Sequence, residues 1–262
     1  MDKIIKYIKV DLYRCFLSKR FVTAVVIILV VLLLGVQEAE KGYFDADVYS
    51  YFLFTMQMTP HFLIFSGAAF AYAGSFCEDR EHCYIRNEVM RGNKKSFVAA
   101  RVVTVFLSAQ IVVMLGSAAF AGILHFFHPW AQPDTTNMYE MAAEDGLFRS
   151  LPMGGYHFLY FVLWGLAYGV LAGILSVVST WISLYISNTV LILISPVVLF
   201  YVLDHFYSRF FTATTYGINI FFTLEYSWTE NTRLAVLVMY LIALAALLLF
   251  GCLIYGRLKK EV

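Results

Sequence analysis

The sequence predicts an all-α, polytopic membrane protein with six transmembrane helices, because it is strongly apolar and its charges leave long gaps. Apolar side chains make up 61% of the 262 residues and charged ones 14%, whereas soluble domains have about 45–50% and about 25%. Uncharged runs cover residues 21–37, 48–77, 102–133, 150–203 and 234–256. A transmembrane helix needs about 20 apolar residues, so the run 150–203 is long enough for two helices and the five runs provide six spans.

The distribution of basic residues predicts that both termini lie on the cytoplasmic side. Of the 19 Lys and Arg residues, 15 lie in segments 1–20, 77–101 and 257–262, as the positive-inside rule requires of inner loops. The cysteines lie on or near the same side, where a reducing cytosol keeps thiols free. Cys77 and Cys83 are spaced too widely for a zinc pair and lack a second pair, so we expect neither disulfides nor a metal site.

Residues 1–20 are predicted to form an amphipathic elbow helix in the inner leaflet. Ile4, Ile8 and Leu12 recur at four-residue spacing, and the lysines lie mostly elsewhere on the helix. A soluble leading helix fits less well, because the apolar stripe continues directly into the first span. A cleaved signal peptide is disfavoured because no small-x-small cleavage site follows.

The first two spans, at about residues 21–37 and 51–76, flank an acidic outer loop. Its acids are Glu38, Glu40, Asp45 and Asp47. They suit a cationic substrate, although outer loops are in any case depleted of Lys and Arg. The second span places Gln57, Pro60 and His61 near the bilayer midplane, where polar side chains face a bundle interior or a water-filled path. A histidine held by a neighbouring helix is favoured over a proton relay, because no second buried ionisable residue offers a relay.

Residues 77–95 are the most charged part of the chain and are predicted to form a cytosolic helix. Acids come first and bases follow, which suits the helix dipole, and Arg91-Gly92 is a typical helix stop. Such a helix, held between two spans, favours docking of a cytosolic protein over a solvated connector. The candidate docking residues are Glu78, Asp79, Arg80, Tyr84, Ile85, Arg86, Glu88, Val89, Arg91 and Gly92.

The remaining spans are expected at about residues 97–127, 157–179, 189–203 and 234–255. Arg101 is expected to extend its side chain to the inner surface. The outer loop 128–156, rich in Pro and Gly, predicts irregular structure with a short helix. Gly165, Gly169 and Gly173 form overlapping G-x-x-x-G motifs for close helix packing, either within the chain or at a dimer seam. Ser195 and Pro196 predict a kink in the fifth span.

Residues 204–233 form an outer aromatic segment between the fifth and sixth spans. Its uncharged stretch is too short to cross the membrane. We expect one or two short re-entrant or interfacial helices there, with aromatic side chains at headgroup depth.

Taken together, this arrangement resembles the ABC-2 type permeases, the transmembrane subunits of type V ABC exporters. The resemblance covers residues 1–262 as a single domain, and its most specific pieces are Asp11-Leu12-Tyr13-Arg14 leading into Ser18-Lys19-Arg20-Phe21, and Arg91-Gly92 followed by Lys94-Lys95. It implies a dimer with an identical or similar permease, and two separate ATPase subunits that bind ATP and Mg. It also implies that residues 78–95 dock on the ATPase and that residues 183–188, almost uncharged here, make a weaker contact.

The resemblance further implies a substrate path lined by Gln57, Pro60, His61, Ser195 and Pro196. The chain has no phosphate-binding loop of its own, so it is expected to be no enzyme and to hold no cofactor. We expect a hydrophobic or amphipathic cargo, such as a peptide antibiotic, drug or lipid-like molecule, in a bacterial plasma membrane, with lipids and no nucleic acid as further partners. A self-sufficient channel or carrier is the alternative, and an intramembrane enzyme is less favoured because no nucleophile and base can be paired.

Overall fold

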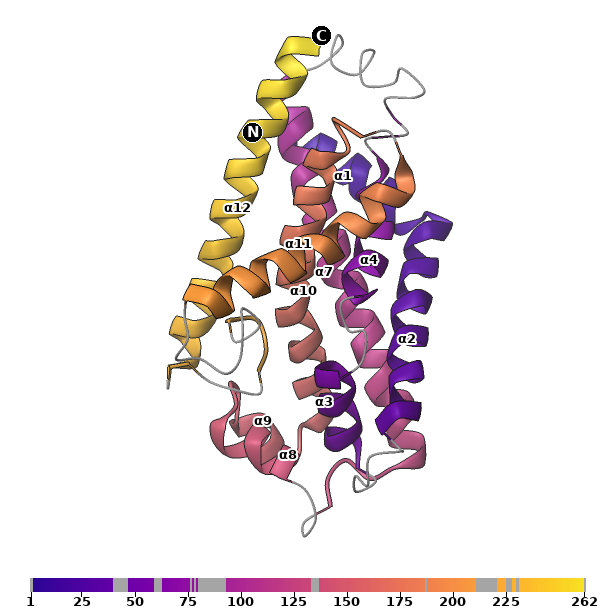
Figure 1. Ribbon diagram of the computed structural model, residues 1–262, viewed down its shortest axis with the longest axis vertical. Helices are drawn as coiled ribbons and strands as arrows, with labels where there is room; N and C mark the ends of the chain where they lie inside the picture. The colour runs from indigo at the N-terminus through magenta and orange to yellow at the C-terminus, as the bar shows by residue number, and fades with distance from the viewer. Residues whose placement is uncertain are drawn as a thin grey trace.

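The protein is all-helical in the residues that its structure, a computed structural model, describes (Figure 1). These are residues 2–39, 47–58, 63–75, 77, 79, 93–132, 137–186, 188–210, 221–224, 228–229 and 231–261. The long helices are α2 (Lys19–Ala39), α7 (Lys94–Phe127), α10 (His157–Ile182), α11 (Thr189–Phe210) and α12 (Thr232–Glu261). The shorter ones are α1 (Asp2–Phe16), α3 (Val48–Met58), α4 (Leu63–Phe70), α8 (Asn137–Glu140), the π-helix η2 (Met141–Asp145) and α9 (Ser150–Met153).

Five of these helices are long and apolar enough to cross a membrane. They contain the stretches Lys19–Gln37, Lys94–Phe127, His157–Ile182, Thr189–Tyr207 and Thr232–Lys260. The predicted second span lies partly outside the described residues, and its described helices are α3 and α4, with 11 and 8 residues. At 1.5 Å per residue neither helix alone crosses a hydrocarbon core of about 30 Å. The chain is therefore an all-α protein of membrane type, and five helices among its described residues could each cross a membrane.

Polar side chains mark where four of the long helices begin. The Ser18 hydroxyl accepts from Phe21 N (3.2 Å) before α2, and Asn93 Oδ1 accepts from Lys95 N (3.0 Å) before α7. Asn188 and Asn231 accept in the same way from Val190 N (2.9 Å) and Arg233 N (3.1 Å) before α11 and α12. Ser and Asn satisfy the amides that a first helical turn leaves open, so these boundaries follow from the sequence.

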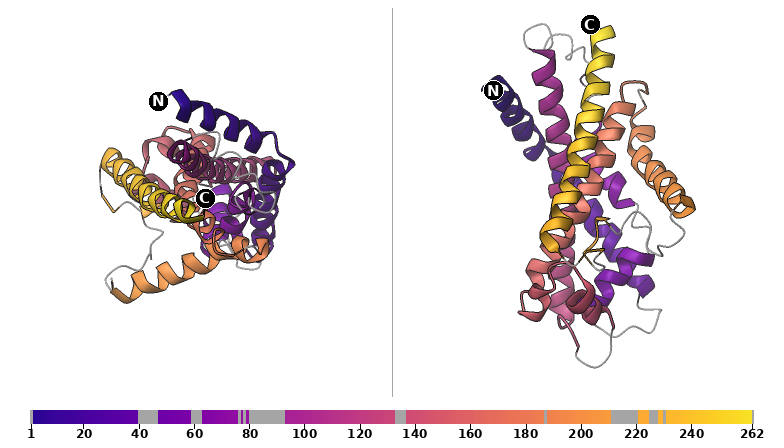
Figure 2. Two further views of the ribbon diagram at one scale, coloured as in Figure 1. Left: turned by 90° about the horizontal axis from the view of Figure 1, so that it is seen from above. Right: turned by 90° about the vertical axis from the view of Figure 1, so that its left-hand side faces the viewer.

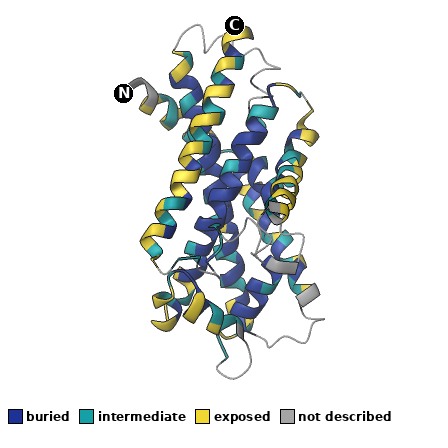
Figure 3. Cartoon of the chain, turned by 60° about the vertical axis from the view of Figure 1, so that its left-hand side comes forward, coloured by how far each residue is buried: buried dark blue, intermediate teal, exposed yellow. Residues whose placement is uncertain are grey.

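Helices α7 and α10 form the centre of the bundle (Figure 3), where 67% and 78% of their apolar stretches are buried. The glycines of α10 face α7: a Cβ atom at Gly169 would lie 2.7 Å from the carbonyl oxygen of Gln110, and one at Gly173 would lie 2.5 Å from Cδ2 of Phe106. One at Gly165 would collide with the hydroxyl of Ser117. These three glycines therefore let the backbones of α10 and α7 approach closely within the chain. Because α7 covers them, they are not open to a dimer partner.

Helices α11 and α12 lie at the edge of the bundle, with only 17% of each apolar stretch buried. Helix α11 runs obliquely across the others in Figure 1, and from above it extends away from them (Figure 2). Its outward side carries Val198, Tyr201 and Phe206, all exposed. Pro196 lies inside this helix.

The two ends of the molecule are formed by different helices. Figure 2 shows the chain termini at the same end, where α1, the start of α7 and the end of α12 also lie. The opposite end holds α8, η2 and α9, so the predicted irregular loop 128–156 contains three short helices rather than one. Ala142 and Leu147 are buried there, and Leu147 N donates to the carbonyl of Leu224 (2.8 Å), which belongs to the outer aromatic segment. Burial of these apolar side chains explains the extra order.

Candidate functional site

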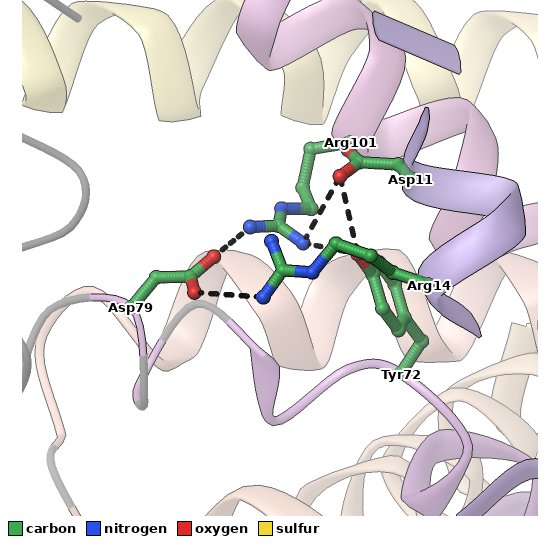
Figure 4. Close-up of polar contacts among 5 residues, drawn as sticks. All are labelled: Asp11, Arg14, Tyr72, Asp79 and Arg101. Atoms are coloured by element: carbon green, nitrogen blue, oxygen red, sulfur yellow. Dashed lines mark hydrogen bonds and ion pairs between the residues drawn. The ribbon is translucent and has the colours of Figure 1, made fainter. Parts of the chain in front are cut away.

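A cluster of charged side chains, most of them buried, lies where α1 meets α7 (Figure 4). At its centre is Arg101 of α7, whose side chain is 0% exposed. One guanidinium nitrogen donates to Asp79 Oδ2 in a short contact. The other donates to the Tyr72 hydroxyl (2.5 Å) and lies 3.7 Å from Asp11 Oδ1. We call Asp11, Arg14, Tyr72, Asp79 and Arg101 the Arg101 network.

The network joins three separate parts of the chain. Helix α1 contributes Asp11 and Arg14, α7 contributes Arg101, and the segment that follows α4 contributes Tyr72, in a turn, and Asp79, in helical conformation. The Tyr72 hydroxyl donates to Asp11 Oδ1 (3.2 Å) while it accepts from Arg101. The second oxygen of Asp79 lies 3.5 Å from Arg14 Nη2. Each carboxylate therefore contacts the central arginine and one further partner.

Two carboxylates face two guanidinium groups in the network, of which that of Arg101 is fully buried and that of Arg14 is 47% exposed. Both acids are only 6% exposed, and burying charge is costly unless it is paired and hydrogen-bonded. The Tyr72 and Phe97 rings lie 5.1 and 5.6 Å from Arg101 Cζ, which adds cation–π attraction. Such a network holds its members in one arrangement, since removing one partner leaves a buried charge uncompensated.

The expectation that Arg101 reaches the inner surface is wrong. Instead, α1 covers this part of α7, and Asp11, Tyr72 and Asp79 offer oxygen atoms that replace water around the guanidinium. A signal for this was present in the sequence. Asp11 follows Ile8 by three residues and precedes Cys15 by four, and this spacing places the carboxylate on the apolar face of α1. A lone acid on such a face requires a buried partner.

Of the candidate docking residues, the structure describes Asp79, which it places in the Arg101 network. Asp79 is thus directed into the bundle. The other candidates lie outside the described residues, namely Glu78, Arg80, Tyr84, Ile85, Arg86, Glu88, Val89, Arg91 and Gly92. Their docking role stays a prediction.

The predicted path residues are brought together only in part. Gln57 lies in α3 but its side chain is not among those described, and Pro60 and His61 lie outside the described residues. Ser195 Oγ is 2.9 Å from Ser179 Oγ and 2.7 Å from the carbonyl of Ile192. Ser195 therefore links α11 to α10, and Pro196 beside it is buried.

Cys15 lies next to the network, one turn after Asp11 on α1. Its side chain is buried and faces Ser108 of α7, and burial raises the pKa of the thiol to about 11. The thiol is therefore protonated at neutral pH and unreactive, since the thiolate is the nucleophile. In the described part of the chain no three His, Cys, Asp or Glu side chains are grouped to hold a metal ion.

Asp47, one of the acids of the predicted outer loop, is buried at the opposite end of the molecule. Its Oδ1 accepts from Ser50 N (2.7 Å) and its Oδ2 from Gln132 N (3.3 Å), and Val48 N donates to the carbonyl of Pro129 (3.1 Å). Asp47 therefore caps α3 and fastens it to the segment after α7. Glu40 and Asp45 lie outside the described residues, and the side chain of Glu38 is not described.

Comparison of the chain with protein-family models, with characterised proteins and with solved structures finds no match.

Proposed function

We propose that this chain is the transmembrane permease subunit of an ATP-driven exporter, whose ATPase subunits are separate chains. The proposal includes six spans with both termini in the cytoplasm, residues 1–20 as an elbow helix on the inner leaflet, and a second permease, identical or similar. It rests on the strongly apolar helical body, on the absence of a phosphate-binding loop, and on the charged segment between the second and third spans.

The main support for the proposal is the pair of ion contacts that Asp79 makes with two helices. Asp79 stands at the start of the charged segment, and its carboxylate contacts Arg101 of α7 and Arg14 of α1. Arg101 in turn contacts Asp11. A displacement of the charged segment by an ATPase therefore acts directly on two helices through charged contacts. Switching proteins use such stiff links to move packed helices between two arrangements.

The proposed cargo is hydrophobic or amphipathic, because the described span helices are nearly free of acids and bases in their central parts. Arg101 lies in the second turn of α7, close to the end of the helix rather than its middle. Coupling to ion gradients uses ionisable side chains deep in the membrane, so a self-sufficient carrier is the weaker alternative.

The test is affinity purification of the tagged full chain in mild detergent and in lipid nanodiscs, followed by mass spectrometry of bound proteins. Recovery of a stoichiometric ATPase with a phosphate-binding loop is the expected result. Reversing the charges of Glu78, Arg86 and Arg91 should release this ATPase without changing the yield of folded permease. Recovery of the chain alone under both conditions would overturn the proposal and favour the carrier.

A second test concerns His61. In the reconstituted complex His61→Ala should change substrate-stimulated ATP turnover more than basal turnover, if His61 lines the path. Equal changes in the two rates, or none, would assign His61 to helix packing.

A further inference from the structure

A cavity of about 290 Å³ lies beside the Arg101 network, where α1 turns into α2. Its wall includes Arg14, Ser18, Lys19 and Arg20 on one side and the turns after α4, with Ser75, on the other. A single water needs only about 10–15 Å³ of such space, so the cavity has room for a much larger polar group. It is distinct from the predicted substrate path, which involves α3 and α11.

The cavity wall carries an excess of positive charge. Among its described residues Arg14, Lys19 and Arg20 are basic and Asp79 alone is acidic. Arg14 contacts Asp79 and balances it, so Lys19 and Arg20 are the further positive charges of this wall. Helix α2 also begins here, so the positive end of its dipole adds to the field. This combination attracts an anion.

The wall also offers a hydroxyl group that nothing in the described chain satisfies. Ser75 Oγ is buried and has no hydrogen-bond partner among the described residues. Buried polar atoms normally have one. An oxyanion in the cavity would provide an acceptor for this hydroxyl.

The surroundings indicate that the anion is carried by a lipid. Lys19 begins α2, one of the helices apolar enough to cross the membrane, so the cavity lies at the membrane–water boundary. Val22, Val26 and Val30 follow Lys19 at helical spacing and are exposed, which gives an apolar stripe that starts at the cavity and runs along the helix. A headgroup in the cavity would place an acyl chain on this stripe.

We propose that this cavity binds the phosphate of an anionic phospholipid, with Arg14, Lys19 and Arg20 around the headgroup and the exposed valines of α2 against an acyl chain. The site lies against Tyr72 and Asp79, so a bound lipid contacts the same elements that the Arg101 network joins. This inference does not depend on the proposed exporter function, because it needs only that α2 crosses a membrane.

The test is native mass spectrometry of the purified full chain in detergent, with phosphatidylglycerol or zwitterionic phosphatidylcholine added. The wild type should retain one phosphatidylglycerol in preference to phosphatidylcholine. Lys19→Gln with Arg20→Gln should lower the affinity for phosphatidylglycerol about thirtyfold, because each basic residue near an anionic lipid contributes about a factor of five to the binding constant. The matched control, Lys259→Gln with Lys260→Gln, removes the same charge at the end of α12 and should retain the lipid.

Two further experiments test whether the cavity itself binds the lipid: a variant that fills the cavity and a competition with phosphate. Gly74→Leu adds a side chain to the cavity wall without changing charge, where a Cβ atom meets only Thr189 Cγ2 at 4.0 Å, and it should also reduce lipid retention. Inorganic phosphate at millimolar concentration should not displace the lipid. Displacement by phosphate would assign the cavity to a soluble anion and overturn the lipid proposal. Equal retention of both lipids, or by both double variants, would overturn it as well.

Discussion

Arg101 and Asp79 form a buried ion pair that joins the first turns of α7 to the start of the charged segment, and the same Asp79 holds Arg14 of α1. Because the pair is desolvated, it orients its neighbours more strongly than a surface pair, whose two side chains move freely in water. The position of α1 on the bundle therefore depends on charges that lie on two other segments.

The first prediction concerns the loss of this pair. Asp79→Asn removes one of two carboxylates that neutralise Arg101, and a broken buried pair costs about 3–5 kcal/mol. We expect a fall of several degrees in the apparent melting temperature of the purified protein. Asp145→Asn is the matched control, because Asp145 is exposed in η2 at the opposite end. An equal effect of the two substitutions would show that the Arg101 network does not stabilise the fold.

The second prediction uses Cys15 as a reporter of the contact between α1 and α7. In a variant whose other cysteines are replaced by serine, Cys15 should resist maleimide at pH 8, because it is buried and its pKa of about 11 keeps it protonated. Asp11→Asn weakens the ion pair with Arg101, and a loss of about 1–2 kcal/mol raises the population of a detached α1 about 5–30-fold. Labelling should accelerate by a similar factor.

The control for this experiment is Lys9→Gln, which also changes one charge on α1 but on its exposed side. It should leave the labelling rate unchanged. Rapid labelling of Cys15 before any substitution would contradict the packing of α1 against α7.

The third prediction concerns the close approach of α10 to α7. Gly169→Ala places a Cβ atom 2.7 Å from the Gln110 carbonyl oxygen and 3.0 Å from its Cα, and backbone atoms cannot rotate away. Overpacking of this kind costs about 1–3 kcal/mol. Gly251→Ala in α12 meets nothing within 4 Å and should be neutral or slightly stabilising, since Ala is the better helix former. Thermal unfolding of both variants distinguishes the two sites, and equal stability would contradict the observed packing.

The helical class and most of the spans were predictable, because long uncharged runs have one physical explanation in a protein of this composition. The structure places single helices on five of them. The predicted second span stays a prediction, because it lies partly outside the described residues and its described helices are α3 and α4.

The Arg101 network was not predicted, because charges are interpreted along the sequence as local patterns whereas ion pairs form between distant segments. Arg101 near the end of a span is typical of a side chain that reaches the membrane surface. Its burial depends on how α1 folds back over α7, which no local pattern encodes. Asp11 on the apolar face of α1 was the one local sign that a buried basic partner exists.

The last prediction separates two roles for Asp47, whose position in an acidic outer loop suits attraction of a cationic substrate but whose carboxylate caps α3. Asn is as good an N-cap as Asp, whereas Ala loses about 0.5–2 kcal/mol. If the cap is its role, Asp47→Ala should lower the apparent melting temperature more than Asp47→Asn, because the Asn side-chain oxygen still accepts from Ser50 N, 2.7 Å from Oδ1 in the native protein, and loses only the longer bond from Gln132 N (3.3 Å). If charge is its role, both substitutions should reduce transport equally and leave stability unchanged. Since Asp47 is 0% exposed and both of its oxygens accept backbone amides, we expect the first pattern.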